Sequence, residues 1–195
     1  AQQMAGEPLA DLGLNIEQHH FFFNDSLYQN IALHCAVGLA GTLVSGWVPP
    51  LGSLLHLLGA LSYRLDTTRR AYLLRRLLSF KPSQNLMATL PAQQPLRLRL
   101  VFIAHADAAF TGRIFDPCLV KALNARTLPP SLSFLSRPMQ LVNRTQFALA
   151  ASAALRTVLG PFGIALRPLE YVLSLPALLS FLVNCELVLR DEVVP

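Results

Sequence analysis

The sequence predicts a mainly α-helical membrane protein with two transmembrane helical hairpins, about four segments, plus a surface amphipathic helix and a small β-strand pair from an incomplete α/β domain. Three observations support this class. The 195-residue chain is 53% hydrophobic and only 14% charged, whereas soluble domains carry roughly 25% charged residues. Its apolar residues gather in two long regions. Between them, residues 64–144 hold 13 basic and three acidic side chains, as in a membrane protein with one cytoplasmic section.

The first 30 residues form an acidic and aromatic N-terminal segment. They hold four acidic side chains and no basic one, which does not fit a secretory signal. His19 and His20 precede three phenylalanines, and we expect this group to anchor at the membrane interface. Three isolated cysteines are expected to be small buried apolar side chains rather than disulfide or zinc ligands: Cys35, Cys118 and Cys185.

Residues 31–63 are predicted to form the first transmembrane hairpin. An uncharged run over residues 31–48 reaches Pro49 and Pro50, and a second apolar run ends at Tyr63. A proline pair does not fit inside a regular helix, so we expect it at the hairpin tip. Small residues would let the two helices approach closely: Gly38, Gly41 and Ser45.

Residues 64–80 are predicted to form an amphipathic helix at the membrane surface. Leucine and aromatic side chains can share one face, while arginines on the other face meet anionic lipid headgroups: Arg69, Arg70, Arg75 and Arg76. No aromatic platform or known nucleic-acid motif accompanies these arginines, so we expect no nucleic-acid partner.

Residues 81–145 are predicted to be a cytoplasmic section with a strand pair and loops. Residues 85–90 and 96–104 alternate or run apolar around a short proline-containing loop, which is typical of two paired strands. Two strands leave unpaired edges, so we expect another segment or subunit to cover them.

Residues 146–190 are predicted to form the second transmembrane hairpin. Glycines and a proline at residues 160–163 break the apolar pattern, which indicates the turn. Arg156 and Glu186 fall within this hairpin and could neutralise one another as a structural ion pair. The alternative is that they form part of a proton path.

His34 and His56 lie in the first hairpin, where imidazoles are costly and often functional. Counted from the prolines at 1.5 Å per residue, their depths differ by about 13 Å, too much for two axial ligands of one haem. Each could ligate one chlorophyll-type pigment, or make a hydrogen bond between helices.

His105 ends the apolar strand, and Asp107 follows two residues later. A histidine with an aspartate at this spacing can bind a metal while the carboxylate orients the imidazole. The same pair also fits a turn in which the histidine is simply hydrogen-bonded.

The segments SQNLMATLP and RLRLVFIAHADAAFTGRIFDP resemble the start of the zinc aminopeptidase family of the bacterial leucyl aminopeptidase type. The resemblance is closest to its bacterial membrane-embedded members, and the order of elements agrees over most of residues 31–195. It implies that zinc binds His105 and that Asp107 orients this ligand. Ala108 departs from the family, which has Ser or Thr there.

The same resemblance implies an active site that is incomplete as given. The family's bridging aspartate follows a motif like residues 193–195, so we expect residues 191–195 to start a missing or truncated C-terminal part. A two-zinc hydrolase needs several anionic ligands and a general base, which one histidine and one aspartate do not supply.

The expected location is the bacterial inner membrane, with both termini and residues 64–145 on the cytoplasmic side. The expected partners are the lipid bilayer and either the missing part or other membrane subunits. The alternative function is a non-catalytic accessory subunit packed against a larger membrane complex, for example a respiratory or photosynthetic one.

Overall fold

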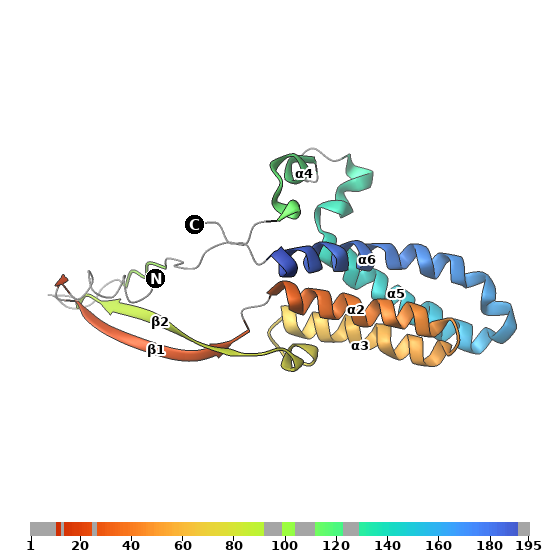
Figure 1. Ribbon diagram of the computed structural model, residues 1–195, viewed down its shortest axis with the longest axis horizontal. Helices are drawn as coiled ribbons and strands as arrows, with labels where there is room; N and C mark the ends of the chain where they lie inside the picture. The colour runs from red at the N-terminus through yellow and green to blue at the C-terminus, as the bar shows by residue number, and fades with distance from the viewer. Residues whose placement is uncertain are drawn as a thin grey trace. The chain divides into compact units, whose positions relative to one another are not determined.

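The structure is a computed structural model that describes residues 11–12, 14–24, 27–91, 99–103, 112–122 and 129–190. The described chain is mostly helical and holds a two-stranded antiparallel sheet. Its contacts divide it into two units (Figure 1). The strand unit contains β1 and β2, and the helical unit contains the other elements.

Four long helices build the helical unit: α2 (Leu27–Ser45), α3 (Pro49–Thr67), α5 (Pro138–Leu159) and α6 (Arg167–Arg190). The pairs α2–α3 and α5–α6 are antiparallel hairpins, as the sequence predicted (Figure 1). Because α2 packs on both α3 and α6, and α5 packs on the same two helices, the four helices form a square bundle. The two hairpins therefore share one interior.

The two hairpin turns use the residues that the sequence indicated. Residues 46–48 form the first turn, and Pro49 occupies the start of α3, where its missing N–H is no loss. In the second turn α5 ends at Leu159, and the next residue, Gly160, has a φ of 54° and a ψ of −130°, which favour glycine. A 3₁₀ segment, η4 (Gly160–Leu166), then leads into α6.

The predicted surface helix over residues 64–80 was wrong. Helix α3 continues to Thr67, and the N–H groups of Thr68 and Arg69 then bond to the carbonyls of Arg64 and Asp66. Arg69 adopts a φ of 56°, a left-handed conformation that ends a right-handed helix. After this stop a short 3₁₀ turn follows, η1 (Leu74–Leu77), and it packs against α2 and α3.

The predicted pairing of residues 85–90 with 96–104 was also wrong. Strand β2 (Lys81–Thr89) pairs with β1 (Asn15–Phe23), in an antiparallel register that places Asn15 opposite Thr89. Residues 99–103, the described part of the expected second strand, are not in a strand. The N-terminal segment expected at the membrane interface supplies the true partner, because its isoleucine and phenylalanines favour extended backbone.

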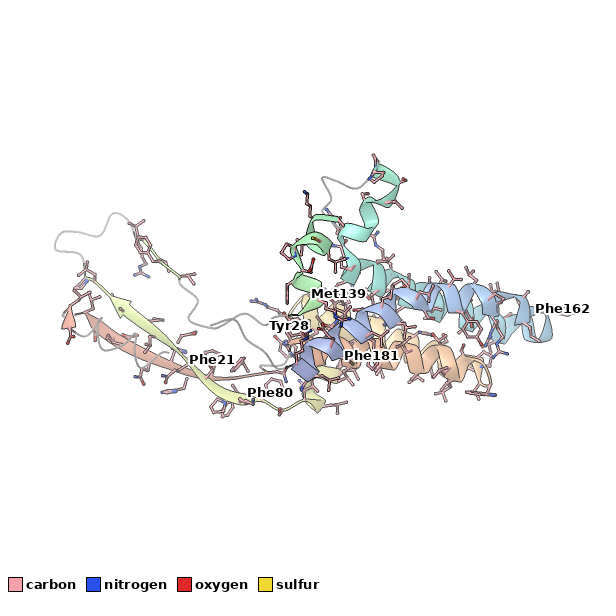
Figure 2. The ribbon with its side chains drawn as sticks, turned by 45° about the horizontal axis from the view of Figure 1, so that its top comes forward. Phe21, Tyr28, Phe80, Met139, Phe162 and Phe181 are labelled. Carbon is pink, nitrogen blue, oxygen red and sulfur yellow. The ribbon has the colours of Figure 1, made fainter. Side chains whose placement is uncertain are left out.

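Short elements of the helical unit follow in the middle of the chain: η2 (Arg113–Phe115), α4 (Pro117–Ala122) and η3 (Pro130–Ser136). The ring of Phe115 meets that of Tyr28 edge to face at 6.4 Å, at the end of the bundle opposite Phe162 (Figure 2). Cys35 is buried as expected, but Cys118 on α4 is exposed, which corrects its prediction. Helix α4 buries none of its residues, so it offers no core for that thiol.

Two helical segments are long and apolar enough to cross a membrane, Leu27–Ser45 and Phe162–Arg190. The other two long helices, α3 and α5, do not meet the same criterion of length and composition. Both carry several polar side chains, which lower their average hydropathy. The helical architecture was thus predicted, whereas four separate membrane-spanning sequences are not supported by hydropathy alone.

Candidate functional site

Polar side chains occupy the interior of the helical unit. Among the described residues, its buried polar and charged side chains outnumber the buried apolar ones. Asparagine, histidine, glutamine, arginine and carboxylate groups all occur among them: Asn30, His34, His56, Asp66, Gln146, Arg156, Glu170 and Asn184. Buried groups of this kind need partners. The interior of the bundle is therefore the candidate site, and it has a basal, a central and a tip region.

The basal region lies where α2 begins and α3 ends. Asn30 donates to Asp66 at 2.7 Å, and Arg75 of η1 pairs with the other oxygen of the same carboxylate at 3.1 Å. The guanidinium of Arg75 also lies over the ring of Tyr72, 5.5 Å from its centroid. These contacts attach the 3₁₀ turn to the first hairpin.

His34 links the two helices of the first hairpin. Its Nδ1 lies 2.7 Å from the carbonyl of Asn30, and its Nε2 lies 2.9 Å from the hydroxyl of Ser62. Because a carbonyl only accepts, Nδ1 carries the proton, and Ser62 donates to Nε2. Both ring nitrogens are thus engaged within the bundle, and the bond to Ser62 joins α2 to α3, which is one of the two roles that the sequence left open for His34.

The central region is built around Gln146 of α5. Its amide lies against Gly38 of α2 and Gly59 of α3, where an added Cβ would come within 2.5 Å and 2.8 Å of the amide atoms. The Nε2 group donates to the carbonyl of His34 at 3.4 Å. Glycine at both positions is what lets one glutamine lie between the two helices.

His56 occupies the next level of the bundle. Its ring packs flat enough on Gly41 that an added Cβ there would lie 3.1 Å from three ring atoms. Within the described structure, its buried Nδ1 and the Oε1 of Gln146 have no hydrogen-bond partner. The close approach at Gly41 confirms one of the expected small-residue contacts, but the described residues give His56 Nδ1 no partner across the helices.

The tip region contains an ion pair between Arg156 and Glu170. Their closest atoms are 3.3 Å apart, and the side chains are only 5% and 4% exposed. Ser45 and Ser152 donate to the two carboxylate oxygens at 3.2 Å and 3.0 Å. Arg156 also donates to the carbonyl of Ser45. This tip cluster joins α2, α5 and α6.

The predicted pairing of Arg156 with Glu186 was wrong. Glu186 instead pairs with Arg190 one turn later at 2.7 Å and accepts from the N–H of Arg113 at 3.3 Å. Since α5 and α6 are antiparallel, Arg156 lies near the turn and Glu186 at the opposite end of the bundle. Glu170 was not among the candidates, although its position just after the turn could have indicated it.

The four arginines predicted to contact headgroups have different surroundings. Arg75 is held by Asp66 and Tyr72. The other three are exposed on or near η1, at the basal end of the bundle: Arg69, Arg70 and Arg76. The structure leaves these three arginines accessible for an anionic group.

The predicted zinc ligands His105 and Asp107 lie outside the described residues. Within the part of the chain that the structure describes, no group of three histidine, cysteine or carboxylate side chains could hold a metal ion. Zinc binding therefore stays a prediction from the sequence.

Comparisons with protein-family models, with curated proteins and with solved structures found no match.

Proposed function

We propose that the helical unit is a membrane anchor whose four helices cross the bilayer together. The observation that carries this proposal is the inverted arrangement of side chains. Polar and charged groups fill the interior, while leucines cover the outside of α3 and α6 at exposures between 38% and 85%: Leu51, Leu54, Leu57, Leu58, Leu61, Leu169, Leu175, Leu178, Leu179, Leu182 and Leu189. Lipid tails accept such a surface, whereas water does not.

The same arrangement supports crossing by α3 and α5. Several of the polar residues that lower their average hydropathy are buried in the bundle, such as His56, Gln146 and Arg156. Arg64 and Arg144, which also lower it, are exposed and lie near the end of α3 and the start of α5. A helix with one polar face can cross a membrane when that face is turned toward its neighbours. Hydropathy averaged over the whole helix does not take into account which face of the helix the polar side chains occupy.

The charge distribution supports an orientation. The 13 basic residues from position 64 to 144 begin with Arg64 in the last turn of α3 and end with Arg144 near the start of α5. They therefore gather at one end of the two hairpins and in the section between them, and basic residues stay on the cytoplasmic side. We place this section and both termini in the cytoplasm of a bacterium, with the bundle in its inner membrane.

The resemblance to membrane-embedded zinc aminopeptidases supports a metallopeptidase-like role for the domain that the bundle anchors. In this proposal His105 binds zinc, and Asp107 accepts a hydrogen bond from its imidazole and orients it. The bundle would then keep a metallopeptidase-like domain at the membrane surface, with the remaining carboxylate ligands and the general base supplied by further residues.

The membrane proposal is tested by extraction and labelling. We expect the protein to remain in membranes after carbonate washing. The exposed thiol of Cys118 should react with an impermeant maleimide in inverted vesicles and not in intact spheroplasts. Cys118→Ser is the matched control for labelling at this site. Release by carbonate would contradict the anchor, and labelling of Cys118 in spheroplasts would contradict the orientation.

The zinc proposal is tested by metal analysis of the protein made from the intact gene. We expect bound zinc, and we expect His105→Ala to lower its amount. His19→Ala, which changes a histidine on β1, should leave the zinc content unchanged. A stop codon directly after Pro195, or equal zinc content in the two variants, would overturn the peptidase assignment.

A second function, that of a non-catalytic accessory subunit, is favoured by one observation in the strand unit. Residues 100–103 form an unbroken apolar run whose side chains are 70–91% exposed. An exposed apolar surface of this kind is typical of a site where a protein partner binds. This candidate predicts that partner proteins copurify with the protein in stoichiometric amounts in mild detergent. It also predicts that His105→Ala leaves this association unchanged. Isolation of the protein alone would exclude it.

A further inference from the structure

An apolar groove of about 360 Å³ follows the contact between α2 and α6. Its lining includes small side chains from both helices, namely Ala32, Ala36 and Cys185. Larger side chains form the rest of its lining: Leu33, Leu78, Phe181, Val188 and Leu189, with Gln29 beside them. Phe181 projects from α6 (Figure 2). We call this feature the α2–α6 groove.

The groove has a direction relative to the bundle. Because α2 and α6 are antiparallel, Gln29 near the start of α2 and Leu189 near the end of α6 mark its basal end. Ala36 and Phe181 mark the other end. The eight residues from Gln29 to Ala36 span about 10 Å, because seven steps of 1.5 Å separate the first from the last. The groove thus runs from the basal end of the bundle toward its middle.

Positive charge lies at the basal end. Leu78 lines the groove, and the exposed Arg76 is two residues before it on η1. Arg75 is engaged by Asp66 at 3.1 Å, so Arg76 is the better placed of this pair to meet an anion. Arg69 and Arg70, also exposed, precede the same turn.

From this combination we propose that the α2–α6 groove binds one acyl chain of an anionic phospholipid whose phosphate is held by Arg76. The inference rests on the proposed membrane function. Basic groups beside a crevice between membrane helices are typical of sites for anionic lipid headgroups. An acyl chain matches the apolar lining, and a phosphate matches the arginine.

The dimensions argue against a partner helix as the occupant. A helix that crosses the membrane beside α2 needs about 20 residues, or roughly 30 Å, of complementary surface. The groove covers about two turns of α2. A single flexible chain that enters from the basal end fits this length.

The test uses the full chain purified in dodecylmaltoside. Phosphatidylglycerol and phosphatidylcholine with identical acyl chains are added in turn, and native mass spectrometry measures the lipid retained per protein. We expect preferential retention of phosphatidylglycerol. Arg76→Gln should weaken this binding about fivefold, whereas Arg144→Gln, an exposed arginine on α5, is the charge-matched control and should not.

The groove itself is tested by Ala36→Leu, which fills it and should reduce retention of both lipids. Leu54→Phe, which enlarges an exposed side chain of α3, is the matched control. A second measurement uses the unchanged protein: phosphatidylglycerol bound in the groove should slow the alkylation of Cys185. Alkylated Cys185 is identified by peptide mapping, and the exposed Cys118 serves as the internal reference.

Equal retention of the two lipids, or unchanged alkylation of Cys185 with phosphatidylglycerol, would overturn the lipid site. Retention by Ala36→Leu at the wild-type level would also overturn it. Carbonate extraction of the same protein separates this failure from that of the proposed function. A protein that stays in the membrane but shows no lipid preference loses only the lipid site.

Discussion

The two ends of the helical bundle each contain an arginine paired with a carboxylate, but in different surroundings. At the tip, Arg156 and Glu170 are 5% and 4% exposed and belong to the second hairpin. At the base, Asp66 is 6% exposed, but Arg75 is 21% exposed and belongs to a short turn. The tip pair is enclosed by helices, whereas the basal pair has one partner near the surface.

This difference teaches what each pair contributes. A buried pair is costly to disrupt, because the remaining charge has no solvent to return to. A pair with one exposed partner is weaker, because that partner can be hydrated when it is released. The tip cluster, with Ser45 of α2 bonded to both partners, fixes the hairpins against each other. The basal pair fastens η1 to the first hairpin.

The largest effect is expected from Glu170→Leu, which leaves Arg156 buried without its carboxylate. We expect a loss of about 3–5 kcal/mol in the free energy of unfolding, measured by SDS titration of the protein in mixed micelles. The double variant Arg156→Leu with Glu170→Leu should recover much of this loss. A double variant no more stable than Glu170→Leu would contradict the argument from an unpaired charge.

The next effect is expected at Gly52, between the tip and the central region. An added Cβ there would lie 2.2 Å from the Cβ of Ser45 and 2.8 Å from the carbonyl of Gly41. Gly52→Ala must therefore separate α2 from α3, and we expect a loss of about 1–3 kcal/mol in the same assay. Ser53→Ala on the neighbouring position controls for composition. It should lose only its hydrogen bond to the carbonyl of Ala150.

A smaller loss is expected for Asp66→Ala at the base. The substitution removes the acceptor of both Asn30 and Arg75, but Arg75 can turn toward solvent or headgroups. We expect a loss of about 1–2 kcal/mol, together with faster proteolysis near η1. Equal losses for Asp66→Ala and Glu170→Leu would show that burial does not distinguish the two ends.

The smallest effect is expected for Arg75→Gln. It leaves Asp66 bonded to Asn30 at 2.7 Å and removes a partly exposed cation. We expect a loss below about 1 kcal/mol, measured alongside Arg144→Gln as a charge-matched control. A loss as large as that of Asp66→Ala would mean that the guanidinium, rather than the carboxylate, organises the basal region.

Local signals in the sequence were sufficient for the two hairpins. Uncharged runs, the prolines at 49–50 and the turn at 160–163 are features of neighbouring residues, and both hairpin turns lie at these positions. The outer bounds were less exact, because α3 extends four residues past the predicted end at 63 and α5 begins eight residues before the predicted start at 146. The stop at Arg69 was not predictable in the same way. The arginines and leucines of residues 64–80 fit a continuing amphipathic helix. Only the hydrogen bonds back to the carbonyls of α3 and the left-handed conformation of Arg69 interrupt that helix.

The strand pairing shows a second limit. Residues 81–89 have a recognisable extended pattern, but their partner lies in residues 15–23. Proximity in sequence favoured residues 96–104, because a short loop closes with less loss of entropy than a long one. Register across so long a separation is decided by contacts that no local pattern contains.

The sequence by itself determined the excess of apolar residues, the four long helices and the basic section between the hairpins, since each depends on composition or near neighbours. Only the tertiary structure decided which polar groups meet. Arg156 bonds to Glu170 rather than Glu186, His34 to Ser62, and Gln146 lies between Gly38 and Gly59. The reason is geometric: antiparallel packing sets which levels of two helices are adjacent, and a buried polar group is stable only beside a partner at its own level.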